Sequence, residues 1–119
     1  MSDDTQLPGK TTIAPEVLIT IARLTTLNVE GVSRMIPAPA VKVNRIFKRG
    51  LSEGVDIEVR DDVVYADLYL ILKSGVNIRE VSRKIQHEIA RAISEMVGMQ
   101  VGRVNIHVED IDYPEENEA

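Results

Sequence analysis

The order of apolar and polar residues divides the C-terminal half of the chain into three elements. Val63–Lys73 alternates with period two, Asn77–Val97 repeats its apolar residues at helical spacing, and Val101–Val108 returns to period two. The helix would be about 31 Å long at about 1.5 Å per residue, and the first strand about 34 Å long at about 3.4 Å per residue. Because these lengths match, we expect one amphipathic helix to lie along the strand and cover its apolar face.

The ends of this helix can also be read from the sequence. Asn77 is a good N-cap with Glu80 three residues later, and Gly98 suits the left-handed position that follows a last helical turn. The residues expected to face the sheet lie on one stripe: Ile78, Val81, Ile85, Ile89, Ala92, Ile93 and Met96.

The N-terminal half predicts a second helix and a hairpin. Gly9–Ile13 is compatible with a short edge strand, and Pro15 suits the first turn of a helix that would run to Asn28. The apolar stripe expected on that helix consists of Val17, Leu18, Ile21, Leu24 and Leu27. Gly54–Arg60 alternates strictly, and the pair Asp61-Asp62 then predicts a tight turn into the next strand.

These elements predict an α+β fold of two layers in the order β-α-β-β-α-β. A small, mostly antiparallel or mixed sheet would be covered on one face by the two amphipathic helices, and its other face would meet water or a partner. The last strand fits beside either Val55–Arg60 or Val63–Lys73, and the sequence leaves this choice open. A length of 119 residues fits one domain, predicted at residues 9–111, with flexible tails at residues 1–8 and 112–119.

Composition narrows the classes of function. The chain has no cysteine, which excludes disulfides and thiolate metal sites and is compatible with a reducing cytoplasm. A net charge of −5 argues against general affinity for nucleic acid. No stretch approaches the roughly 20 apolar residues that a membrane-spanning helix needs. We therefore expect a cytoplasmic protein that reaches a membrane only through a partner or through its own surface.

Residues that commonly carry catalysis or hold cofactors are sparse. His87 and His107 lack partners at the spacing of zinc ligands, and the glycines form no phosphate-binding loop. A pair formed by His107 and a nearby carboxylate on a sheet face is more often surface charge than a catalytic pair. We therefore predict no catalytic, cofactor-binding or metal-binding residues, no small-molecule substrate and no enzymatic activity.

Two surfaces remain as candidate interaction sites. The outer sheet face would combine polar residues with tyrosines, which offer a large rigid contact area and a polar tip. The partner-binding residues predicted there, with Ile71 exposed between two tyrosines, are Tyr65, Asp67, Tyr69, Ile71, Arg103, Asn105 and His107. The second surface is a basic patch within the irregular segment Pro37–Gly54, made by Lys42, Arg45, Lys48 and Arg49. The alternatives are an ordinary sheet face and a solvated connection.

Five short stretches carry a family resemblance through their order and spacing. They are Gly9–Val17, Gly31-Val32, Tyr65–Tyr69, Gly75–Ile78 and Val104–Val108, and they extend over nearly the whole predicted domain. In these stretches the chain resembles the alkaline shock protein family, also called Gls-type proteins, which are bacterial envelope stress response proteins. The segment Pro37–Gly54 matches the family least.

The resemblance implies a small cytoplasmic general stress protein without known catalysis. It also implies self-assembly, and association with the inner face of the cell membrane through a separate anchor protein. The leading hypothesis is therefore a non-enzymatic, self-associating interaction module for cell envelope homeostasis. The alternative is a regulatory or nucleic-acid-binding module that uses the basic segment Lys42–Arg49.

Overall fold

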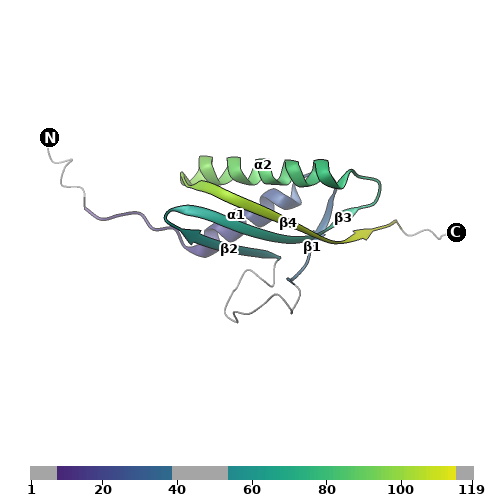
Figure 1. Cartoon of the computed structure of the whole chain (residues 1–119). Coiled ribbons are helices and arrows are strands. Elements are labelled where there is room, and N and C mark those ends of the chain that lie inside the picture. The colour runs from purple at the N-terminus through teal and green to yellow at the C-terminus, as the bar shows by residue number, and fades with distance from the viewer. Residues whose placement is uncertain (1–7, 39–53, 115–119) are drawn as a thin grey trace.

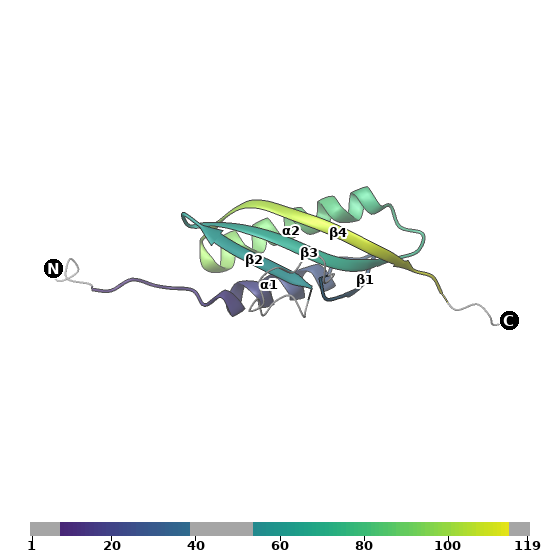
Figure 2. The same cartoon turned by 60° about the horizontal axis from the view of Figure 1, so that its bottom comes forward.

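Two helices and four strands make up the part of the chain that the structure, a computed structural model, describes, which is residues 8–38 and 54–114 (Figure 1). The elements are α1 (Pro15–Leu27), β1 (Val32–Met35), β2 (Val55–Arg60), β3 (Val63–Lys73), α2 (Ile78–Val97) and β4 (Gln100–Asp112). Both helices lie on one face of the sheet, as Figures 1 and 2 show. The predicted α+β class with two layers is therefore confirmed.

The sheet is built around β3. On one side β4 runs parallel to β3 along its whole length, from the pair Val63 and Gln100 to the pair Lys73 and Asp112. On the other side β2 and then β1 pair antiparallel with successive halves of β3. This topology settles the choice that the sequence left open, because the last strand lies beside β3 and not beside β2. A parallel neighbour requires a long crossover, and α2 provides it.

The backbone of Tyr69 marks the junction where β1 and β2 meet in line. The Tyr69 N–H donates to the carbonyl oxygen of Gly54 at 2.9 Å, and the Tyr69 carbonyl accepts from the N–H of Ile36 at 3.1 Å. One residue of the central strand therefore holds the ends of both short strands.

The core lies between β3 and the helices. The inward side chains of β3, Val64, Ala66, Leu68, Leu70 and Leu72, are at most 1% exposed. From α2 the stripe of Val81, Ile85, Ile89 and Ile93 packs against them, as predicted, while Ile78 and Met96 at its two ends remain exposed. The long helix thus covers the long strand.

Local signals at the element ends behave as the sequence predicts. The Asn77 side chain accepts from the N–H of Glu80 at 3.0 Å, and Gly98 closes α2 in the left-handed conformation with φ 72°. Asp61 and Asp62 both have positive φ, at 53° and 66°. Two such residues form the tight hairpin turn whose twist matches the flanking strands.

Some details of the prediction are wrong. Gly9–Ile13 forms no strand, and the short first strand is instead Val32–Met35. The last strand extends to Asp112, four residues beyond the predicted end at Val108. The buried face of α1 is Leu18, Ile19, Ala22 and Thr26, so the helix is turned away from the expected stripe and leaves Val17, Leu24 and Leu27 exposed. Small Ala22 and Thr26 are fully buried, which allows the close approach that fixes this rotation.

Candidate functional site

The sheet face turned away from both helices, here called the outer face, carries the predicted partner-binding residues. The register places Tyr65 of β3 beside Arg103 of β4. In the same way Asp67 lies beside Asn105, and Tyr69 lies beside His107. The structure therefore brings six of the seven predicted residues together in adjacent pairs. The seventh, Ile71, lies beside Asp110 instead of a predicted residue.

Asp67 is the polar centre of the outer face. Its Oδ1 accepts a hydrogen bond from Asn105 Nδ2 at 3.1 Å and contacts His107 Nε2 at 2.9 Å. On the opposite side, Asp56 of β2 is its register partner. The side chains of Asp67 and His107 are about one-third exposed, at 34% and 29%. This His–Asp pair is thus within reach of solvent.

Tyr69 is closed off from solvent rather than exposed. Its ring stacks on the ring of His107 with centroids 4.5 Å apart and planes 10° apart, and only 5% of the residue is exposed. Burial raises the pKa of the Tyr69 phenol first, and the negative charges of Asp67, Asp56 and Glu109 raise it further. The phenol is therefore held in its neutral form.

The expected exposure of Ile71 is wrong as well, because it is also only 5% exposed. The open apolar patch of Tyr65, Tyr69 and Ile71 that motivated the prediction therefore does not exist. What remains open on the outer face is more polar: Tyr65, Asp67, Arg103, Asn105 and His107 keep intermediate or high exposure.

Two guanidinium groups flank the open tyrosine. Arg60 lies 4.2 Å from the ring centroid of Tyr65, and Arg103 lies 5.9 Å from it. Arg60 also pairs with Glu58 at 3.2 Å. Sequence reasoning missed Arg60 as part of this cluster. The predicted two-residue turn after β2 could have revealed it, because such a turn places Arg60 beside the start of β3. A tyrosine ring with two guanidinium groups close to it can contact an aromatic or acidic group of a partner.

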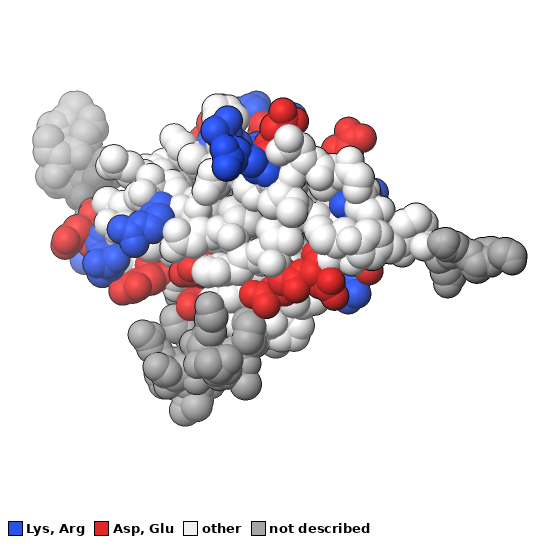
Figure 3. Space-filling view, turned by 45° about the vertical axis from the view of Figure 1, so that its right-hand side comes forward, with Lys and Arg blue, Asp and Glu red and all other residues white. Residues whose placement is uncertain are grey.

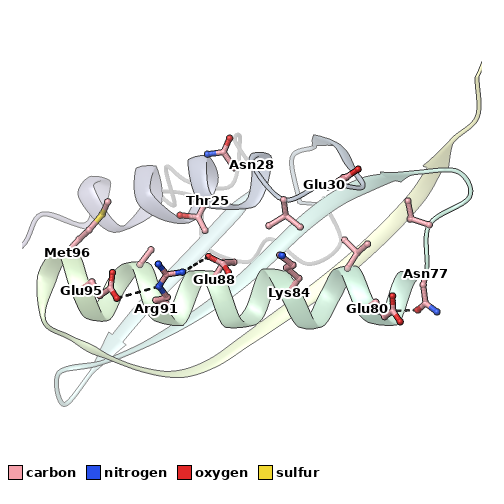
Figure 4. A pocket seen from close by; sticks show the side chains of 14 residues that line it. Thr25, Asn28, Glu30, Asn77, Glu80, Lys84, Glu88, Arg91, Glu95 and Met96 are labelled. Atoms are coloured by element: carbon pink, nitrogen blue, oxygen red, sulfur yellow. Dashed lines mark hydrogen bonds and ion pairs between the residues drawn. The ribbon is translucent and has the colours of Figure 1, made fainter.

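A concave surface lies between the helices, and sequence reasoning missed it. This groove has a volume of about 870 Å³ and is lined from both helices and from the loop before α2 (Figure 4). Arg91 reaches Glu88 and Glu95 at 3.4 Å each, and Glu30, Glu80 and Lys84 also line the groove. Four carboxylates and two cations therefore line the groove, which is acidic overall.

Charge is unevenly distributed over the surface. On the side shown in Figure 3, acidic side chains gather toward the lower edge, whereas basic and further acidic side chains are interspersed at the top and left. The predicted basic patch of Lys42, Arg45, Lys48 and Arg49 lies outside the described residues, and its role stays a prediction. Within residues 8–38 and 54–114, no cluster of three or more His, Asp or Glu is arranged to hold a metal ion, and no helix is long and apolar enough to span a membrane.

Comparison with known proteins decides the family. The sequence model of the alkaline shock protein 23 family, described as having a cell envelope-related function, matches residues 3–113. The chain belongs to this family. The resemblance read from the sequence is therefore confirmed, and the function of the family is related to the cell envelope.

Curated relatives in this family are described as uncharacterized proteins. YqhY of Bacillus subtilis is 33% identical over 112 residues, which are 93% of this chain and 82% of the relative. Spy1535 of Streptococcus pyogenes is 34% identical over 108 residues, which are 90% of this chain and 82% of the relative. YloU of Bacillus subtilis is 24% identical over 106 residues, which are 87% of this chain and 88% of the relative. No solved structure matches the chain significantly.

Proposed function

We propose that this alkaline shock family protein is a non-enzymatic interaction module of the cell envelope, which self-associates and is held at the inner face of the membrane by a partner protein. The envelope-related function of the family supports the location. The outer face supports the interaction role, because it presents side chains suited to binding a protein.

The observation that carries the proposal is the Tyr65 cluster, meaning Tyr65 with the guanidinium groups of Arg60 and Arg103 at 4.2 Å and 5.9 Å from its ring centroid. Both described helices lie on the other side of the sheet, so neither covers this cluster (Figures 1 and 2). Tyrosine and arginine are the residues most often found at the energetic centre of protein interfaces. The Tyr65 cluster is therefore the docking site that we assign to the membrane partner.

Sedimentation with membranes tests the location. Purified protein would be mixed with native cell membranes, with the same membranes after protease treatment, and with protein-free vesicles of the same lipids. We expect co-sedimentation with native membranes alone, because the link is a protein. Equal binding to protein-free vesicles would show direct lipid binding, and no binding to any of the three would contradict the location at the membrane.

A pair of tyrosine variants tests the docking site. Tyr65→Ala should weaken binding to native membranes about tenfold or more, which is the usual effect of losing an interface hot spot. Tyr113→Ala is the matched control, because Tyr113 lies beyond β4 and is 74% exposed. Circular dichroism would verify that both variants are folded. Equal binding by the two folded variants would contradict the assignment of the Tyr65 cluster.

A further inference from the structure

The edge of β4 turned away from β3 is the longest strand edge without a neighbouring strand among the described elements. β4 has 13 residues and, within the described part of the chain, pairs only with β3. Figures 1 and 2 both show it as an outer strand of the sheet. A long edge strand offers a row of unpaired N–H and C=O groups to another strand.

One side-chain contact shows which backbone groups point outward. The carbonyl oxygen of Val104 accepts a hydrogen bond from Gln86 Nε2 of α2 at 2.9 Å, so this carbonyl turns away from β3. Backbone groups of alternate residues point to the same side of a strand. The outward groups in the regular part of β4 are therefore those of Val104, Ile106 and Val108.

The limits of this regular part are set by two irregularities. The register with β3 shifts between Val64 and Tyr65 and again between Leu70 and Ile71, which leaves Gly102 and Glu109 of β4 as extra residues. The stretch that presents a straight edge is consequently Arg103–Val108.

This stretch is complementary to itself when a second copy runs antiparallel with Ile106 at the centre. Val104 then lies opposite Val108 of the second copy, and Ile106 lies opposite Ile106. On the outer face Asn105 lies opposite His107. Arg103 meets the acidic end of the partner strand, where Glu109 and Asp110 follow one another. Apolar residues meet apolar residues, and the basic end meets the acidic end twice.

The apolar side chains of β4 are incompletely covered in the single chain. Leu68 and Leu70 of β3 are 0% exposed, but their register neighbours Ile106 and Val108 keep intermediate exposure. A second β4 alongside would cover the remaining apolar surface of these two residues and extend the core across the junction.

We propose that two copies of this chain pair through their β4 edges, antiparallel and about a two-fold axis at Ile106, to form one continuous sheet. The interface is isologous, since each copy contributes the same strand. The outward N–H and C=O groups of Ile106 bond to those of Ile106 in the second copy, and those of Val104 bond to those of Val108. The Val104 carbonyl becomes available when the side chain of Gln86 moves away from it. This inference rests on the self-association in the proposed function and assigns it a surface.

Charge reversal tests the register. Arg103→Glu would place a carboxylate against Glu109 and Asp110 at both ends of the interface, because the two-fold axis repeats each contact. Sedimentation velocity over a concentration series should give a dimer for the wild type and a dissociation constant raised about tenfold or more for Arg103→Glu. The double variant Arg103→Glu with Glu109→Arg should recover much of the lost affinity.

The matched control is Lys84→Glu, which makes the same change of charge at an exposed position on the side of α2 that faces the groove between the helices. It should leave the dissociation constant unchanged. A wild-type protein that stays monomeric at every concentration would overturn both this interface and the proposed self-association. A dimer that Arg103→Glu and Lys84→Glu weaken equally, or that neither variant weakens, would overturn only the β4 interface. Capture of an extended segment of another protein by the β4 edge of a single copy would also overturn only the β4 interface.

Engineered cysteines provide a second measurement of the same pairing. The chain has no cysteine of its own, so Asn105→Cys and His107→Cys each introduce a single thiol. Residues opposite each other in a pair that is not hydrogen bonded lie about 4.5 Å apart at Cα, within the range for a disulfide. Mild oxidation of the mixed variants should yield mostly the crosslinked heterodimer. Equal yields of the two homodimers and the heterodimer would contradict the register.

Discussion

Gly54 lies at the point where β1 and β2 meet in line, and its surroundings leave no room for a side chain. Its φ is +85°, and a Cβ added there would lie 2.7 Å from the carbonyl oxygen of Ile36 and 2.9 Å from that of Tyr69. The Tyr69 carbonyl oxygen accepts one of the two hydrogen bonds that hold the junction, and the N–H of Ile36 donates it, so this backbone has little freedom to move.

The first prediction concerns this glycine. Gly54→Ala should lower the free energy of unfolding by about 2–3 kcal/mol, since it adds a steric clash to the strain of a positive φ. Gly75→Ala is the control: Gly75 has φ +83° with nothing within 4 Å of an added Cβ, so it should show the strain of about 1 kcal/mol alone. Urea unfolding measures both, and equal losses would contradict the role of the close contact.

Tyr69 is the residue at which sequence and structure differ most. Alternation along β3 correctly places it on the outer face, but alternation carries no information about what else covers that face. The stacking of its ring on His107 depends on the parallel register with β4, which the sequence left open. The burial of Tyr69 could therefore not be predicted from the local sequence pattern.

The second prediction follows from this burial. Tyr69→Glu would place a carboxylate where solvent is nearly absent and where Asp67, Asp56 and Glu109 already contribute negative charge. The free energy of unfolding should fall by about 3 kcal/mol or more. Tyr69→Phe keeps the ring and should cost about 1 kcal/mol or less. Similar stability of the two variants in thermal unfolding would contradict the burial of Tyr69.

At the scale of elements, the parts with local determinants were the most predictable. α2 has an N-cap, a C-cap glycine and a continuous apolar stripe, and all three are features of a single segment. The hairpin of β2 and β3 is likewise fixed by two turn residues between alternating runs. β1 is short, and its pairing partner lies far along the chain, so no local pattern fixed its place in the sheet.

The rotation of α1 has the same explanation. Its hydrophobic residues occupy more than one face, and the sequence alone offered no reason to prefer small Ala22 and Thr26 over the larger exposed Leu24. That preference comes from the space available between α1, α2 and the sheet, which only the packed structure defines.

A bridge across β3 joins the N-terminal and C-terminal strands. The hydroxyl of Ser33 donates to Asp112 Oδ2 at 2.6 Å, and Arg34 Nε approaches the same oxygen at 3.3 Å. The hydrogen bond from Ser33, and then that from Arg34, hold the pKa of Asp112 below its ordinary value of 3.8. β1 and β4 are thus linked although they lie on opposite sides of β3.

The third prediction is the pH dependence of this bridge. A carboxyl whose pKa is lower in the folded state stabilises that state above its unfolded pKa, and the contribution disappears as the pH falls through the folded value. Wild type should therefore be more stable than Asp112→Asn at neutral pH. The difference should shrink once the pH falls below about 3.8, the ordinary pKa of an aspartate. Ser33→Ala should remove part of the same difference, and a pH-independent gap between wild type and Asp112→Asn would contradict this origin.

At the scale of the whole molecule, the long helix and the long strand are the parts that organise everything else. Leu18 of α1 and Ile89 of α2 are buried in one cluster over the inner face of β3. A core shared in this way has no boundary at which one helix could separate from the other. The layer architecture could be predicted because the matching lengths and apolar faces of the long helix and the long strand allow few other arrangements.

The fourth prediction is cooperative unfolding through this shared core. Leu18→Ala and Ile89→Ala each remove side-chain volume from a site that is at most 1% exposed, and each should cost about 2–5 kcal/mol. Both variants should still unfold in one transition, with far-UV circular dichroism and tyrosine fluorescence giving the same midpoint. Tyr65 and Tyr69 on β3 report on the sheet, whereas circular dichroism is dominated by the helices. If Leu18→Ala shifted only the helical signal and left the tyrosine midpoint in place, α1 would be an independently melting element and the single core would be disproved.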